Sequence, residues 1–247
     1  MRSRPRPPII ADSSGRRYDE EMKQTLLFVL LAARAAVGAA PSEPARPVPV
    51  CDEPMHHLKL ENAYVRVFDV TVPPRGRTLF HAHALDYVFV TLGASHVRSE
   101  RAEGEPVELT LADGETRFTA APLVHRAVNL SDAPFHNLTI EIVKGGGSPP
   151  EPPLPVMPGH SVVFENDRVR IDRQTLDPGQ STGVHTHTLR SLGVCVSAAR
   201  VEYAEPGGKS ETADLTAGQF NWHEGTRTHS LKNVGTSRFE AIEIEWK

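Results

Sequence analysis

The chain has 247 residues and a formal net charge of −4, with 27 Lys and Arg against 31 Asp and Glu. This balance lacks the basic excess that nucleic-acid binding requires, so we expect no nucleic-acid partner. Aromatic residues make up only 6 %, whereas proline (21), glycine (18) and histidine (12) are numerous. Such a composition favours short strands joined by many turns, with histidine used for chemistry.

Residues 1–40 are typical of a polar arm followed by a signal peptide. After Lys23, an apolar run extends from Thr25 to Val37, and the small residues that follow suit a signal peptidase. The run is too short to span a bilayer comfortably. We therefore expect a periplasmic or secreted protein with no membrane partner after cleavage. An amphipathic helix packed on the domain is the alternative.

Residues 41–53 are rich in proline and in small or polar residues, which predicts an extended tether outside any core. The two cysteines of the chain are Cys51 in this tether and Cys195 in a strand-like segment. In an oxidising compartment they can pair. The sequence leaves a disulfide and a buried free Cys195 as alternatives of similar weight.

An internal repeat organises the rest of the chain. Residues 54–143 align with residues 158–247 at a constant offset of 104 without a gap, and 23 of these 90 positions are identical. Between the copies, residues 144–157 contain three consecutive glycines and five prolines, which predict a linker. The repeat therefore predicts two domains of the same fold.

Apolar residues alternate with a period of two within each copy, for example over residues 64–72 and 87–97. This period is typical of strands, and no segment after residue 54 keeps a helical period. The pattern predicts an all-β protein made of two small antiparallel barrels or jelly rolls. Contact between the copies would cover exposed strand edges.

Each copy carries a His-x-His pair and a third histidine 42 residues later. Residues two apart in a strand point to the same face, so both imidazoles of a pair can enter one barrel. Three nitrogen ligands with open positions are typical of a reactive site for Fe, Cu, Mn, Ni or Zn. Buried hydrogen bonding is the alternative, and it does not readily explain the recurrence. We expect up to two divalent transition metals per chain, on His81, His83 and His125 and on His185, His187 and His229.

These motifs resemble the cupin superfamily, whose first motif is a glycine, five residues, His-x-His, three or four residues and a glutamate. Gly179 precedes His185 and His187 at this spacing, and the resemblance covers residues 54–247. It implies a bicupin, with two tandem cupin-type jelly-roll β-barrels after the N-terminal signal segment. Both copies lack the glutamate, which resembles the three-histidine cupins and argues against an oxalate-decarboxylase-like mechanism.

Near the first triad, Asp86 and Tyr87 offer an acid and a phenol as fourth ligand, proton donor or substrate partner. We therefore expect the first copy to carry the chemistry. The alternatives are that Asp86 occupies a turn and Tyr87 packs in the wall. The second copy has Arg190 and Ser191 at the matching positions, and a cation there permits the reverse assignment by anchoring an anionic substrate.

Two further repeated pairs have alternative interpretations. Asn129 and Asn233 either orient a metal-ligating side chain by a hydrogen bond or are turn residues, which is more common at such positions. His56 and His160 either cap a barrel mouth or belong to a solvated linker.

Three functions suit this sequence. The first is a metal-dependent, dioxygenase-like oxidoreductase that acts on a small molecule. The second is a module that binds a metal or small ligand without turnover, and the third is a structural bicupin. We rank them in this order. All three stay open, because the fold alone does not decide function. The substrate, the metal and the formation of a homo-oligomer stay open.

Overall fold

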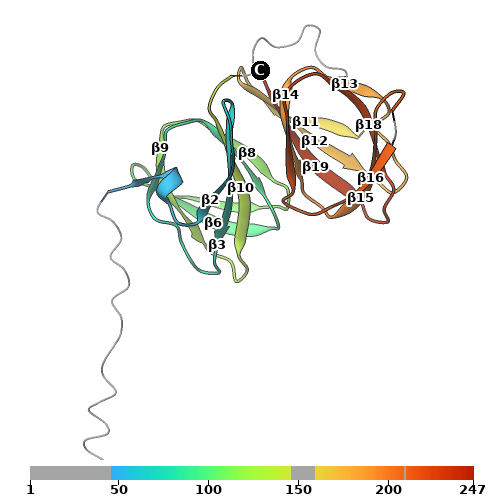
Figure 1. The fold of residues 1–247 in the computed structure, drawn as a ribbon. Helices are drawn as coiled ribbons and strands as arrows, with labels where there is room; N and C mark the ends of the chain where they lie inside the picture. Colours follow the sequence, from blue (N-terminus) through green and yellow to red (C-terminus); the bar gives the residue numbers. More distant parts are fainter. Residues whose placement is uncertain (1–45, 146–158, 209) are drawn as a thin grey trace, which may run out of the picture. The chain divides into compact units, whose positions relative to one another are not determined.

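The computed structural model describes residues 46–145, 159–208 and 210–247 (Figure 1). The expected signal peptide and most of the expected linker at 144–157 lie outside these residues. Within them the regular structure is β, apart from a short 3-10 helix at Val50–Asp52. No helix in this part of the chain has the length and apolarity needed to cross a membrane. The all-β prediction is confirmed.

The first copy folds into barrel 1, which consists of two five-stranded sheets with the orders β1-β4-β9-β6-β7 and β2-β3-β10-β5-β8. Apolar side chains from both sheets form its core. Its strands are β1 Val48–Pro49, β2 His56–Glu61, β3 Val65–Val72, β4 His81–His83, β5 Tyr87–Thr91, β6 Ser95–Arg101, β7 Val107–Leu111, β8 Thr116–Thr119, β9 Leu123–Asn129 and β10 Phe135–Ile142.

The second copy folds into barrel 2, whose sheets have the orders β11-β12-β19-β14-β17 and β13-β18-β15-β16. Its strands are β11 His160–Glu165, β12 Val169–Leu176, β13 His185–His187, β14 Arg190–Cys195, β15 Ala199–Ala204, β16 Ser210–Leu215, β17 Phe220–His223, β18 Arg227–Asn233 and β19 Phe239–Trp246.

The sequence repeat is also a structural repeat. Strands β3, β4, β9 and β10 recur as β12, β13, β18 and β19 with both ends displaced by 104 residues. Even the irregular pairing of β2 between Leu58 and Leu60 recurs in β11 between Val162 and Phe164. Two tandem jelly-roll barrels are therefore confirmed.

Strand β10 shows how alternate residues serve two environments. Ile140 and Ile142 are fully buried in an apolar cluster that also contains Ile244 of barrel 2. Thr139 and Glu141 point the other way, into barrel 1, where Thr139 lines a cavity. Burying one such isoleucine stabilises the fold by about 1.5–3 kcal/mol, so the cluster shared by the barrels contributes substantially to stability.

Residues 48–53 differ from the expected tether. Val48 lies opposite His81 in a parallel pairing of β1 with β4, and Val50 is buried in the core of barrel 1. Pro49 is tolerated because β1 is an edge strand, where one backbone N–H is not required. The tether prediction is therefore corrected for residues 48–53, because their apolar side chains pack into barrel 1.

The two cysteines are both free. Cys51 is exposed, whereas Cys195 is buried in barrel 2 with its Sγ 3.0 Å from the carbonyl oxygen of Ser197. Burial raises the pKa of Cys195 to about 11, so its thiol is unreactive. The structure supports the buried free cysteine rather than the disulfide.

Candidate metal centres

Three predicted histidines meet inside barrel 1. His81 and His83 come from β4 and His125 from the adjacent β9, where His125 lies opposite His81. The ring centroid of His125 is 4.7 Å from that of His81 and 5.4 Å from that of His83. The period of two in β4 places both of its histidines in the interior, where they are 1 % and 2 % exposed.

A fourth histidine joins this cluster from the other sheet. His56 on β2 is buried, and its ring centroid is 4.6 Å from that of His81. One ligand nitrogen from each of His56, His81 and His83 lies within 4.8 Å of the others, and this group does not include His125. The solvated-linker interpretation is therefore wrong for His56. The sequence did contain a sign that His56 is not a linker residue, because the repeat has a histidine, His160, at the matching position.

Glu53 fixes the orientation of His56. The buried carboxylate accepts a hydrogen bond from Nδ1 of His56 at 2.6 Å and another from the backbone N–H of Leu79 at 3.1 Å. Because Nδ1 is engaged, Nε2 is the nitrogen of His56 left for a ligand role. Barrel 2 has Met157 at the position that matches Glu53.

Two other histidines of barrel 1 are held in the same manner. Nδ1 of His81 donates to the carbonyl oxygen of Leu79 at 2.9 Å, and Nδ1 of His125 lies 2.9 Å from Oγ of Ser99. Nε2 of His81 is buried and has no hydrogen-bond partner among the described residues. A buried lone pair without a donor is what a metal ion would satisfy.

A buried glutamate recurs beside each His-x-His pair. Oε1 of Glu141 lies 3.4 Å from Nδ1 of His83 in barrel 1, and Oε1 of Glu245 lies 3.1 Å from Nδ1 of His187 in barrel 2. Both carboxylates are at most 1 % exposed. Carboxylates that bind the second nitrogen of a metal-ligating histidine fix its tautomer and orientation. Glu141 and Glu245 are identical at matching positions of the repeat, but the sequence did not predict that each lies next to a histidine.

The histidines of barrel 2 also fit a metal. His185 and His187 on β13 meet His229 on β18, and their ligand nitrogens lie within 4.8 Å of one another. Nε2 of His185 is 3.1 Å from Nε2 of His187, while Nδ1 of His185 lies 3.0 Å from the carbonyl oxygen of Gly183. Two nitrogens bound to one metal at about 2.0–2.1 Å are about 3.0–3.4 Å apart, which agrees with this separation.

A cavity of about 240 Å³ adjoins the histidine cluster of barrel 1. Tyr87 lies in its wall, stacked on His83 with ring centroids 4.2 Å apart, and burial raises the pKa of Tyr87 to about 12. The predicted site residue Tyr87 therefore lies beside the histidines. Most of the remaining wall is apolar and comes from both sheets, including Val70, Phe89, Val97, Leu109, Leu111 and Phe135.

Comparison with known proteins identifies this architecture. No family model matches the sequence, and no curated protein sequence matches it significantly. AerE from Microcystis aeruginosa has a similar structure, with a TM-score of 0.56 and 13 % identity over 79 % of this chain and 98 % of that chain. The chain has a fold of two tandem cupin-type jelly-roll barrels.

Two enzymes with solved structures are similar to this bicupin. A mutant of salicylate 1,2-dioxygenase from Pseudoaminobacter salicylatoxidans has a TM-score of 0.53 and 14 % identity over 74 % of this chain and 72 % of that chain. An oxalate decarboxylase has a TM-score of 0.52 and 12 % identity, over 81 % and 76 % respectively. At such low identities the likeness shows the fold alone, so the chemistry of the bicupin rests on its own residues.

Burial keeps several of the candidate ligands uncharged. Together with neighbouring positive charges, it lowers the pKa of His81 and of His229 to about 3 and that of His125 well below 6.5. A neutral imidazole is the form that binds a metal. The clusters are therefore ready to accept a cation at neutral pH.

The two barrels differ around their clusters. Arg227 and Glu243 of barrel 2 form an ion pair at 3.1 Å, and a Glu243 oxygen lies 4.0 Å from Nδ1 of His187. Barrel 1 has Leu123 and Thr139 at these positions, and both line its cavity. The interior next to the histidines is thus more apolar in barrel 1 and more charged in barrel 2.

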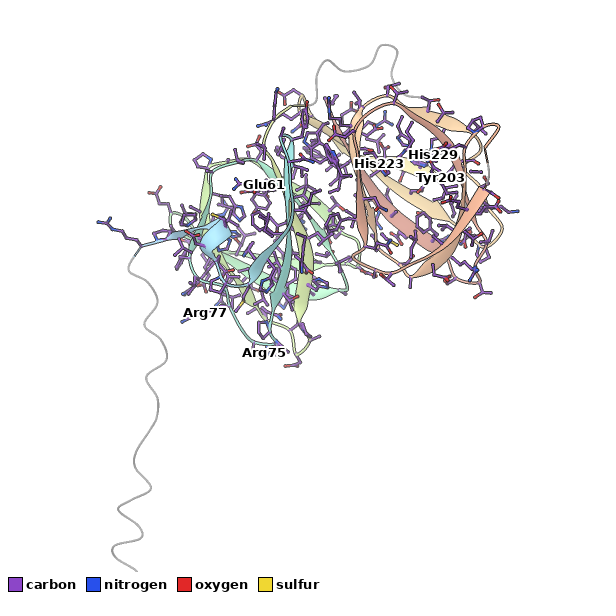
Figure 2. The ribbon with its side chains drawn as sticks, viewed as in Figure 1. Glu61, Arg75, Arg77, Tyr203, His223 and His229 are labelled. Carbon is purple, nitrogen blue, oxygen red and sulfur yellow. The ribbon has the colours of Figure 1, made fainter. Side chains whose placement is uncertain are left out.

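The third histidine of barrel 2 has a different neighbour from its counterpart. Tyr203 replaces Ser99, and its ring centroid lies 5.0 Å from that of His229. Nδ1 of His229 has no hydrogen-bond partner in the described part of the chain. Figure 2 shows Tyr203, His223 and His229 in barrel 2.

His160 is not placed like His56. It is half-buried, and its Nε2 lies 2.7 Å from the side-chain amide nitrogen of Gln174. Its ring centroid is 5.9 Å from that of His185, compared with 4.6 Å between His56 and His81. The fourth histidine is therefore close to the cluster only in barrel 1.

Asp86 lies away from the cavity. One carboxylate oxygen is 2.9 Å from Nη1 of Arg168 in barrel 2, and the other accepts the backbone N–H of Ala121 at 2.8 Å. Asp86 does not line the cavity. The expectation that Asp86 assists the metal is therefore corrected, because both of its oxygens have other partners.

The two repeated asparagines hold loops. Nδ2 of Asn129 donates to the carbonyl oxygen of Ala133 at 2.8 Å, and Nδ2 of Asn233 donates to that of Ser237 at 2.8 Å. Each Oδ1 accepts the backbone N–H two residues further on. The turn interpretation is confirmed for both residues.

Proposed function

We propose that this bicupin is a metal-dependent oxidoreductase of the dioxygenase type that acts on a small molecule in barrel 1. The observation that carries the proposal is that the barrel 1 histidines open onto a cavity of about 240 Å³ with largely apolar walls. Such pockets, with a few convergent polar groups, are the usual sites of small-molecule chemistry. Two enzymes with this fold, a salicylate dioxygenase and an oxalate decarboxylase, act on small molecules.

The metal of barrel 1 would be held by His56, His81, His83 and His125. A divalent iron, copper or manganese ion supplies one-electron chemistry with dioxygen and open positions for a substrate. Glu53 binds Nδ1 of His56, which leaves Nε2 of His56 for the metal, and Glu141 lies close enough to Nδ1 of His83 to bind it when His83 holds the metal.

Tyr87 has a separate role in this proposal. With a pKa of about 12 its phenol stays protonated at neutral pH, so it can donate a hydrogen bond to a bound substrate. It is stacked on His83 and therefore lies next to the metal ligands. The apolar walls around it exclude water and strengthen such a polar contact.

For barrel 2 we propose metal binding without turnover. Its three histidines have a ligand spacing that fits a metal, whereas the paired Arg227 and Glu243 occupy positions that line the cavity in barrel 1. A partly buried ion pair costs energy to separate, so a substrate would displace it only at the expense of binding energy. The second metal would then stabilise the fold of barrel 2.

Metal analysis combined with oxygen uptake tests the proposal. Protein purified from its native host should contain iron, copper or manganese. The protein loaded with that metal should consume oxygen with at least one member of a panel of phenols, thiols and small carboxylic acids. Zinc in both barrels, together with no oxygen uptake by the iron- or copper-loaded protein, would contradict the enzyme and favour a binding module.

A further inference from the structure

A positive charge at the barrel 1 cavity lacks a carboxylate partner among the described residues. Arg101 is the last residue of β6, lies opposite His125 on β9 and lines the cavity. Its side chain is exposed and makes no ion pair or hydrogen bond with the residues that the structure describes. The other arginine of the cavity, Arg117, is already paired with Glu115.

Arg101 shares the cavity with the candidate metal centre. It pairs with His125 across β6 and β9, and both residues line the cavity together with Tyr87. The guanidinium therefore belongs to the same cavity as the phenol and one of the candidate ligands. An anion held by Arg101 would lie between the solvent and the metal site.

We infer that Arg101 binds the carboxylate of a small substrate whose remaining part is apolar. A planar guanidinium suits a carboxylate because it can donate two parallel hydrogen bonds. The apolar body would pack against walls such as Val97, Leu109 and Leu111. This inference rests on the proposed function for the reaction, although the binding itself can be measured without turnover.

The size and charge of the cavity restrict the substrate further. Pockets for drug-sized ligands have about 300–1,000 Å³, so a cavity of about 240 Å³ fits a smaller molecule. Only one of the two lining arginines is free of a carboxylate, so a monoanion is matched better than a dianion. The substrate class is a small aromatic or short aliphatic monocarboxylate.

Barrel 2 provides an internal contrast. Glu205 stands at the position that matches Arg101, and its carboxylate accepts a hydrogen bond from the hydroxyl of Tyr203 at 3.0 Å. A carboxylate at this position repels a carboxylate ligand. Recognition of an anionic substrate is therefore specific to barrel 1.

Calorimetric titration with paired probes tests this inference. Benzoate and hexanoate are compared with their neutral amides, benzamide and hexanamide, on metal-free and Co²⁺-loaded protein. We expect at least one carboxylate to bind about tenfold or more tightly than its amide, in both forms of the protein. Arg101→Gln should abolish this preference, and Arg101→Lys should retain part of it. Arg98→Gln is the matched control, because Arg98 lies on β6 and does not line the cavity.

The same titrations separate the inference from the proposed function. Failure of barrel 1 to take up Co²⁺ would count against the proposed function, while the metal-free protein would still report on Arg101. Three results would overturn the inference. The first is that neither carboxylate binds, and the second is that carboxylate and amide bind with equal affinity. The third is that Arg101→Gln leaves the carboxylate affinity unchanged, whereas removal of the metal abolishes it.

Discussion

Oε1 of Glu141 lies 3.4 Å from Nδ1 of His83, and the other oxygen of the same carboxylate lies 2.8 Å from Nη2 of Arg66. The glutamate comes from one sheet of barrel 1 and the histidine from the other, so the contact joins the sheets at the candidate metal centre. Glu245 and His187 repeat it at 3.1 Å in barrel 2. A buried carboxylate thus faces one candidate ligand in each barrel, as a hydrogen bond in barrel 2 and as a longer ion-pair contact in barrel 1.

Replacing this carboxylate should weaken metal binding in one barrel only. Glu141→Gln removes the negative charge that polarises His83, and loss of such a partner typically costs about 10–100-fold in metal affinity. Co²⁺ titration followed by visible absorption measures this loss, and Glu245→Gln should produce the equivalent loss in barrel 2. Equal affinities in the wild type and both variants would show that the glutamates have only a packing role.

The proposed fourth ligand of barrel 1 predicts an asymmetry between the barrels. His56→Ala should change the visible spectrum of Co²⁺ in barrel 1 and weaken its binding, because one nitrogen ligand is lost. Glu53→Gln should have a smaller effect in the same direction, since it only releases the orientation of His56. The matched control His160→Ala should leave the Co²⁺ spectrum unchanged. Identical spectra for wild type and His56→Ala would exclude His56 from the site.

The metal-free protein should lose stability as the pH falls from 7 to 5. The folded-state pKa of His81 and of His229 is about 3, below the unfolded value of about 6.5, so the unfolded chain binds more protons in this range. Each histidine contributes roughly 2 kcal/mol to the loss between these pH values.

Urea unfolding at both pH values measures this loss. The double variant His81→Asn with His229→Asn should show a shallower pH dependence. The depressed carboxyl pKa values, such as that of Glu53, contribute only at lower pH. A pH dependence equal to that of the wild type would contradict the assignment of these groups.

The apolar cluster shared by the barrels predicts cooperative unfolding. Ile140→Ala and Ile244→Ala should each lower the free energy of unfolding by about 2–5 kcal/mol, because both side chains are fully buried in this cluster. Val163→Ala, at an exposed position, should change it by less than about 0.5 kcal/mol. Both tryptophans lie in barrel 2, so their fluorescence should follow the same transition as far-UV circular dichroism. Separate transitions would show that the barrels unfold independently.

The sequence was sufficient to predict the architecture and the histidine triad of barrel 2, whereas the barrel 1 group with metal-ligand spacing contains His56 in place of His125. The constant offset of 104 and the His-x-His spacing depend on local periodicity and repetition, which are visible in one chain. Contacts between the two sheets of a barrel are not visible in this way. Glu141 and Glu245 stood out as repeat identities, but the sequence does not specify that each faces a histidine on another sheet.

Two sequence interpretations failed because their outcome depends on distant partners, and the alternatives left open for His56 depended on a contact that the pattern does not show. Asp86 is paired with Arg168, which is 82 residues away. His56 joins the cluster because Glu53 orients it. Val48 pairs with β4 in parallel, a long-range pairing that proline-rich composition does not suggest. Tyr87 was expected as a phenol beside the first triad, with packing in the barrel wall as the alternative, and the structure places it in the cavity wall, stacked on His83.

The most direct test of the central claim, that barrel 1 contains the reactive metal centre, is to compare two histidine variants of the metal-loaded protein. Metal content and oxygen uptake are measured on His81→Ala with His125→Ala, and on His185→Ala with His229→Ala, after circular dichroism has shown that both are folded. We predict that each variant loses about one of two metals per chain. Oxygen uptake should disappear only in the first variant. Uptake that survives the barrel 1 changes and disappears with the barrel 2 changes would contradict the account.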